Sequence, residues 1–132
     1  MPETVEPYAL ALVVADNVHR DPGTGKVTIL GTFSVIIAKE FPAKHGIIVI
    51  YFVLTDGHGK SDCTIRLVTV DEDVTIAEAT AEVDFSDPRA IVEGVVAMQG
   101  VVFPSAGEYR LQLVAGTTLL LERRIIVQKA GQ

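Results

Sequence analysis

This sequence has almost no cysteine and no tryptophan, and its basic residues are fewer than its acidic residues. The 132 residues contain a single cysteine, Cys63, no tryptophan, and 11 Lys and Arg against 17 Asp and Glu. One thiol excludes a disulfide framework and a cysteine-based zinc site. The formal net charge of −6 disfavours nucleic-acid binding, because that function depends on a basic surface that meets the phosphates.

Long apolar runs are also missing. The apolar run at residues 9–15 is far shorter than the roughly 20 residues that a membrane-spanning helix needs. It also follows Glu3 and Glu6, whereas a signal peptide carries Lys or Arg at that place. We therefore expect no membrane insertion and a cytoplasmic location.

The length is that of one domain. Apolar residues make up 48% of the chain and charged residues 21%, a balance that excludes a disordered chain. A domain of this size can remove roughly two thirds of its unfolded surface from water, so it needs no cross-links. We expect one domain over residues 1–132, with its core at about residues 8–128 and short flexible termini.

Apolar residues recur at every second position in segments that Gly, Pro and Asp clusters separate, and this period is typical of β-strands. No segment is long enough for a crossover helix, so the pattern predicts an all-β fold with two antiparallel sheets packed as a sandwich of about eight strands. The expected strands cover residues 8–18, 26–38, 47–55, 62–70, 77–85, 90–103, 108–114 and 118–128.

Several positions within these strands predict local irregularity or burial. Gly31, Gly94 and Gly100 indicate bulges or close backbone approaches. The alternation of the last strand slips at residues 122–124, where a further bulge is expected, and Arg123 and Arg124 are expected to be exposed or paired with Glu78 and Glu82. The predicted core contains Leu10, Leu12, Phe33, Phe52, Ile65, Leu67, Phe85, Tyr109 and Leu111.

Two groups of short motifs resemble known protein families. Residues 103–113, FPSAGEYRLQL, resemble the closing strands of immunoglobulin-like and fibronectin-type bacterial modules. A family of small uncharacterised bacterial proteins is similar in ADNVHRD (15–21), TGK (24–26), ILGTF (29–33), FP (41–42) and LTD (54–56). This resemblance covers about residues 8–127. It implies an immunoglobulin-like fold but no activity and no catalytic residues.

One end of the predicted sandwich is a candidate metal site. If neighbouring strands alternate in direction, the loops after the first, third, fifth and seventh strands share that end. Imidazoles and carboxylates together suit a divalent transition ion. The same residue types are also ordinary turn formers. A ligand or metal site is therefore the alternative hypothesis, no cofactor is expected, and the candidate residues are His19, Asp21, Asp56, His58, Asp62 and Asp87.

The sequence contains no recognisable catalytic constellation. Gly57–Ser61 includes Gly-Lys-Ser, but a strand follows it where a phosphate loop needs a helix. No nucleophile elbow is present, Cys63 lies at an inward position of its strand, and His45 is expected in an exposed loop. We expect a protein that is not an enzyme.

The expected strand at residues 47–55 is apolar on both faces, whereas a two-layer sandwich needs only one apolar face. Either another segment of the chain covers the second face, or a partner does. The set with Phe52 is the bulkier, so we expect Val49, Tyr51 and Val53 to face outward and meet a second protein. The sequence thus predicts an interaction or structural module of a bacterial assembly that forms a homo-oligomer or binds another subunit.

Overall fold

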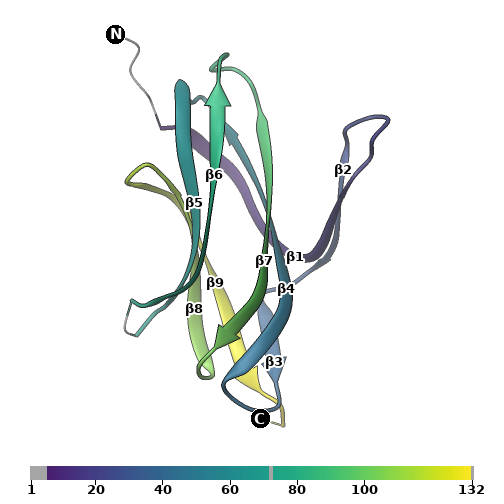
Figure 1. Ribbon diagram of the computed structural model, residues 1–132, viewed down its shortest axis with the longest axis vertical. Helices are drawn as coiled ribbons and strands as arrows, with labels where there is room; N and C mark the ends of the chain where they lie inside the picture. Colours follow the sequence, from purple (N-terminus) through teal and green to yellow (C-terminus); the bar gives the residue numbers. More distant parts are fainter. Residues whose placement is uncertain (1–5, 72, 132) are drawn as a thin grey trace.

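The described residues of the computed structural model, 6–71 and 73–131, form nine strands and no helix (Figure 1). The predicted flexible termini fall largely on residues 1–5 and 132, which lie outside the described residues. The strands are β1 (Tyr8–Arg20), β2 (Val27–Thr32), β3 (Val35–Ala38), β4 (Ala43–Thr55), β5 (Gly59–Thr69), β6 (Thr75–Phe85), β7 (Val92–Phe103), β8 (Gly107–Ala115) and β9 (Thr118–Lys129).

The strands form two sheets that enclose the core. One sheet has four strands in the order β2-β1-β4-β7, and the other has five in the order β3-β9-β8-β5-β6. The predicted all-β sandwich of two sheets is therefore confirmed. The expectation of fully antiparallel pairing is wrong at one place, because β3 runs parallel to β9.

The segment predicted as one strand at residues 26–38 is two strands in different sheets. β2 ends at Thr32, and β3 begins at Val35 on the opposite layer. Gly31 lies directly before the point where the chain leaves the first sheet. It has a φ of 70°, and a Cβ there would lie 2.7 Å from Oδ2 of Asp16. Only glycine combines that backbone conformation with such a close approach.

Arg123 holds the segment that connects the two sheets. Its position in β9 faces inward, and its guanidinium donates to Oγ of Ser34 at 2.7 Å. Longer contacts reach the carbonyl oxygens of Leu12, at 3.4 Å, and Phe33, at 3.5 Å. The expected exposure of Arg123 is therefore wrong, because the side chain is half-buried where β1, β9 and the connection meet.

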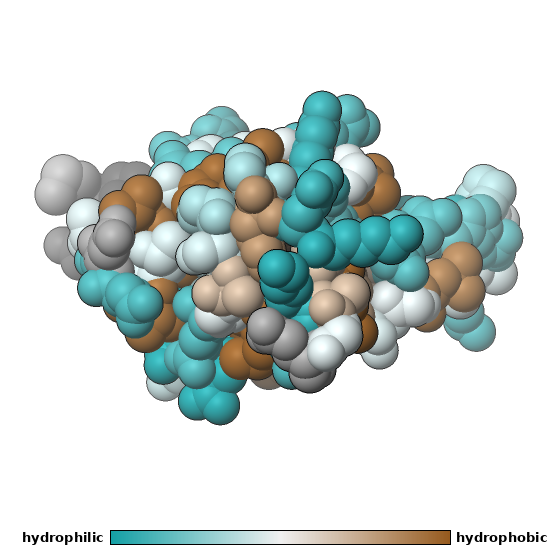
Figure 2. All heavy atoms as spheres, turned by 90° about the horizontal axis from the view of Figure 1, so that it is seen from below, coloured by the Kyte–Doolittle hydropathy of each residue, from teal (hydrophilic) through white to brown (hydrophobic). Residues whose placement is uncertain are grey.

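A projecting hairpin follows from the same chain path. β2 pairs with the second half of β1, residues 15–20, while the first half of β1 pairs with β4. Residues 16–32 therefore extend from the body of the sandwich as an arm (Figure 1). From below, Figure 2 shows this arm as a lobe at the right that carries both apolar and polar side chains.

Most of the predicted core is confirmed, with two exceptions. A register shift between Ala9 and Ala11 turns Leu10 away from the core, and Leu10 is 57% exposed. Phe33 is only half-buried, packed against the core near the connection between the sheets. The remaining predicted core residues are buried, namely Leu12, Phe52, Ile65, Leu67, Phe85, Tyr109 and Leu111.

The irregularities of the strands agree only in part with the prediction. The expected bulge at residues 122–124 is wrong, because the register of β8 and β9 shifts at Leu113/Val114, opposite Leu121 and Leu119. Gly94 is a close approach, since a Cβ there would lie 2.1 Å from Cζ of Phe52. Gly100 has a φ of 63°, a conformation that favours glycine.

Tyr109 anchors the turn between β7 and β8. Its hydroxyl donates to the carbonyl oxygen of Ser105 at 2.6 Å, and its ring meets Phe103 edge-on with a centroid distance of 5.1 Å. Such a tyrosine corner is characteristic of Greek-key sandwiches. It fixes the direction in which the chain enters β8.

Replacing Gly94 by alanine should destabilise the fold, because the new methyl group would overlap the ring of Phe52. We expect a loss of about 1–3 kcal/mol in the free energy of unfolding, measured by urea denaturation. Gly46→Ala is the matched control, since a Cβ at Gly46 meets no atom within 4 Å. Equal losses for the two variants would contradict the close approach, as would a Gly94→Ala effect that persists unchanged in a Phe52→Leu background.

Candidate interaction surface

The outer face of the four-stranded sheet is predominantly apolar. β4 lies between β1 and β7, and its register with both strands aligns outward-facing residues in rows. We call this surface the apolar face. Its rows are Ala11, Val53 and Glu93; Val13, Tyr51 and Val95; and Ala15, Val49 and Ala97, with Ile47 beside Gln99 at the end.

The predicted orientation of β4 agrees with this arrangement. Ile50, Phe52 and Leu54 are buried between the sheets, and the alternate set with Tyr51 and Val53 faces outward and is half-buried. Val49 belongs to the outward set but is only 6% exposed. The structure therefore places all three candidate interface residues on one face, and their contact with a partner stays a prediction.

Two further apolar residues on this face went unpredicted as site residues. Ile47 is 40% exposed and Val95 is 43% exposed, so a large part of each side chain meets water. Val95 contributes because β7 is the neighbour of β4, and strand order cannot be read from the sequence period alone. The apolar composition of β4 and β7 was the only feature of the sequence that pointed to Ile47 and Val95.

A polar contact joins the apolar face to the arm. The hydroxyl of Tyr51 donates to Oε2 of Glu93. Arg20, at the end of β1, donates to Oε1 of Glu93 at 3.5 Å and to the carbonyl oxygen of Gly25 at 3.1 Å. The only carboxylate in the rows of this face thus has two partners.

The outer face of the five-stranded sheet has a contrasting character, because ionic pairs cross β8 and β9. Glu108 lies 3.0 Å from the guanidinium of Arg110 and 2.9 Å from that of Arg124. Glu122 accepts from Gln112 at 2.8 Å and from Arg110, and these hydrogen bonds lower the pKa of Glu122. Arg124 was expected to be exposed or paired with Glu78 and Glu82; it is exposed, and its partner is Glu108.

The predicted metal site is not assembled. The loop at Asp56 does lie beside the loop before β7, because its amide donates to the carbonyl oxygen of Pro88 at 2.9 Å. Asp21 is engaged in the turn of the arm, where Thr24 donates to its carboxylate and lowers its pKa. Nowhere in residues 6–71 and 73–131 do three His, Cys, Asp or Glu side chains lie close enough for an ion, so the geometry does not support this alternative for His19 and His58.

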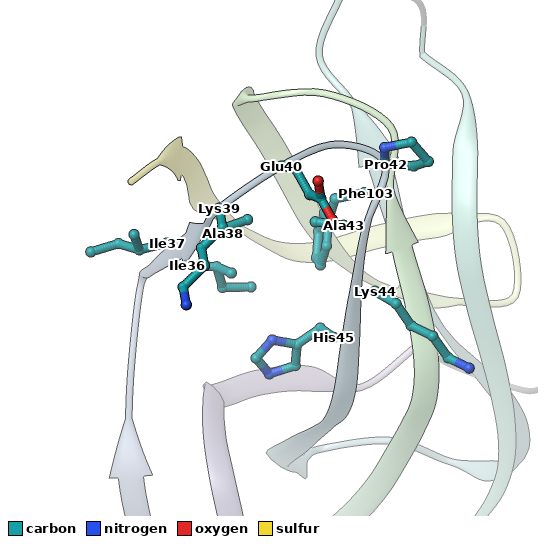
Figure 3. A pocket seen from close by; sticks show the side chains of 10 residues that line it. All are labelled: Ile36, Ile37, Ala38, Lys39, Glu40, Pro42, Ala43, Lys44, His45 and Phe103. Carbon is teal, nitrogen blue, oxygen red and sulfur yellow. The ribbon is translucent and has the colours of Figure 1, made fainter. Parts of the chain in front are cut away.

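A hollow of about 270 Å³ lies between β3 and β4 (Figure 3). His45 of β4 borders this hollow and is half-buried, with its ring centroid 5.8 Å from that of Phe33. The prediction that His45 lies in an exposed loop is therefore wrong. The other borders include Ile36, Pro42 and Phe103, with Lys39 and Glu40 at the rim. The imidazole of His45 therefore packs against the ring of Phe33 at the border of the hollow.

Together these features define the class of the protein. Two packed sheets, an edge strand parallel to the last strand and the corner at Tyr109 are those of an immunoglobulin-like sandwich. The chain belongs to DUF6941, a family of unknown function, whose model matches residues 10–128.

Comparison with solved structures gives a distant likeness. The chain is similar to an immunoglobulin-like protein from Pseudomonas aeruginosa, with 15% identity, 94% of this chain and 98% of that chain covered, and a TM-score of 0.47. No curated protein matches the chain. In the described residues there is no helix that could cross a membrane.

The environment of Tyr51 has a measurable consequence. Burial, and then the hydrogen bond to Glu93, raise the pKa of Tyr51 from 10.0 to about 12. The unfolded phenol loses its proton first, so this group's contribution to stability is lost as the pH rises from about 10 to about 12. Subtracting the ultraviolet titration of Tyr51→Phe from that of the wild type should give a midpoint near 12, and Glu93→Gln should lower it. A midpoint near 10 in both proteins would refute the contact.

Proposed function

We propose that this protein is a non-enzymatic immunoglobulin-like interaction module, and that it associates with a second copy through the apolar face. The observation that carries the proposal is the contrast between the two outer faces. One bears, on β8 and β9, ionic pairs that suit water, and the other exposes Ile47 and Val95 on adjacent strands beside half-buried apolar neighbours. Contiguous apolar surface of this kind marks interaction sites in soluble proteins.

The chemistry of the apolar face favours a second copy as the partner. Glu93 is the only charged residue in its rows, and Tyr51 and Arg20 already bind its carboxylate. Two such faces can therefore meet without bringing unpaired like charges together, although each chain carries a net charge of −6. A two-fold axis is the usual symmetry for a surface that pairs with itself.

Lysine on the apolar face should abolish this association. We expect Val95→Lys, and separately Ile47→Lys, to halve the molar mass measured by light scattering, because each variant would bury a charge against apolar side chains. Both positions are partly exposed in one chain, so the fold should persist. Leu119→Lys is the matched control, since Leu119 is 49% exposed on β9, outside the apolar face.

A dimeric wild type that dissociates only with Val95→Lys or Ile47→Lys supports the proposal. A wild type that is monomeric at high concentration would overturn self-association. Dissociation by Leu119→Lys alone would move the interface to the other sheet. Circular dichroism of every variant checks that the β-structure is retained.

A further inference from the structure

The two edges of the five-stranded sheet differ in charge. β6 forms one edge, and its outer face carries an acidic row of Glu78, Glu82 and Asp84. β3 forms the other edge, where Lys39 follows the strand in its outward alternation, whereas Lys129 of β9, the register partner of Ala38, continues the inward alternation of that strand. All five side chains belong to exposed residues.

The strand directions at these edges are compatible with head-to-tail pairing. β3 runs parallel to β9, and each later pair across the sheet, from β9 to β8, β5 and β6, is antiparallel. β3 and β6 of one chain therefore point in opposite directions. A second copy placed beside the first by simple translation would set its β3 antiparallel to β6, with the same face outward.

The side chains also fit such a pair. In β3, Val35 and Ile37 face outward with exposed side chains, and Lys39 continues the same alternation. In β6 the outward set is Glu78, Thr80 and Glu82. Opposite residues of antiparallel strands share a face, so the pairing brings a lysine of one chain to a glutamate of the other.

A hollow lies beside each of the two edge strands. The hollow of Figure 3 lies beside β3 and includes Ile36 and Ile37 in its wall. A second hollow, of about 350 Å³, lies between β6 and β7 and includes Ile76, Ala77 and Met98 in its wall. Apolar side chains therefore line the gap between the two sheets beside both edges.

We infer that β3 of one chain pairs with β6 of a second copy and that the five-stranded sheets join head to tail. The partner is a second copy because Lys39 at the β3 edge and the acidic row at the β6 edge are complementary within the same sequence. Strand addition supplies partners for the free amides and carbonyls of both edges. Unlike the two-fold contact at the apolar face, this contact is not closed and can extend to further copies.

Charge exchange tests this contact separately from the apolar face. Variant A carries Lys39→Glu and Lys129→Glu, and variant B carries Glu78→Lys and Glu82→Lys. All measurements are made by sedimentation velocity at low salt, in a Val95→Lys background that lacks the proposed two-fold contact. We expect association of the background protein to weaken about tenfold in A alone and in B alone, because like charges then meet.

An equimolar mixture of A and B should recover association, because the acidic β3 of A meets the basic β6 of B while the other two edges keep their natural charges. Lys26→Glu with Arg89→Glu is the control for reversal of two exposed positive charges elsewhere. Failure of the mixture to exceed A and B alone would overturn the inference, as would unchanged association in A. A background protein that is monomeric at all concentrations would overturn it as well.

Discussion

The central constraint on this structure is that β4 carries apolar side chains on both of its faces. The inward set, with Ile50, Phe52 and Leu54, is covered by the five-stranded sheet. Among the described residues no second sheet lies over the outward set, and Ile47 remains partly in water together with Val95 of β7. Since apolar surface is favoured away from water, this uncovered face is the feature that the proposed association explains.

The chain path between the two sheets determines the rest of the architecture. Gly31 and Asp16 lie close together where the arm ends, and Arg123 binds the carbonyl and hydroxyl groups of the connection that follows. These contacts let β2 extend the four-stranded sheet while β3 completes the edge of the other sheet. Both the arm and the β3 edge therefore depend on this one connection between the sheets.

The period of two predicted the strands well, because each strand buries one face and alternation records that burial. The same signal could not divide residues 26–38, since alternation continues across Phe33 and Ser34 and does not say which sheet a residue joins. It could not detect the extra residue between Ala9 and Ala11 that exposes Leu10. The outward position of Tyr51 followed from side-chain bulk, whereas the part played by Val95 required the strand order. His19 and Asp21 lie on the arm, a placement that the order of the loops in the sequence does not reveal. Among the described residues no three of the candidate ligands come close enough to hold an ion.

The most direct test of the account compares the water accessibility of the two outer faces as a function of protein concentration. Hydroxyl-radical footprinting of the wild type, read out by mass spectrometry, reports the oxidation of individual side chains. At high concentration we expect Ile47 and Val95 to become protected relative to a dilute sample, while Leu119, of similar exposure in one chain, keeps its rate. Unchanged oxidation of Ile47 and Val95 over a concentration range in which the protein associates would contradict the claim that the apolar face is the contact surface.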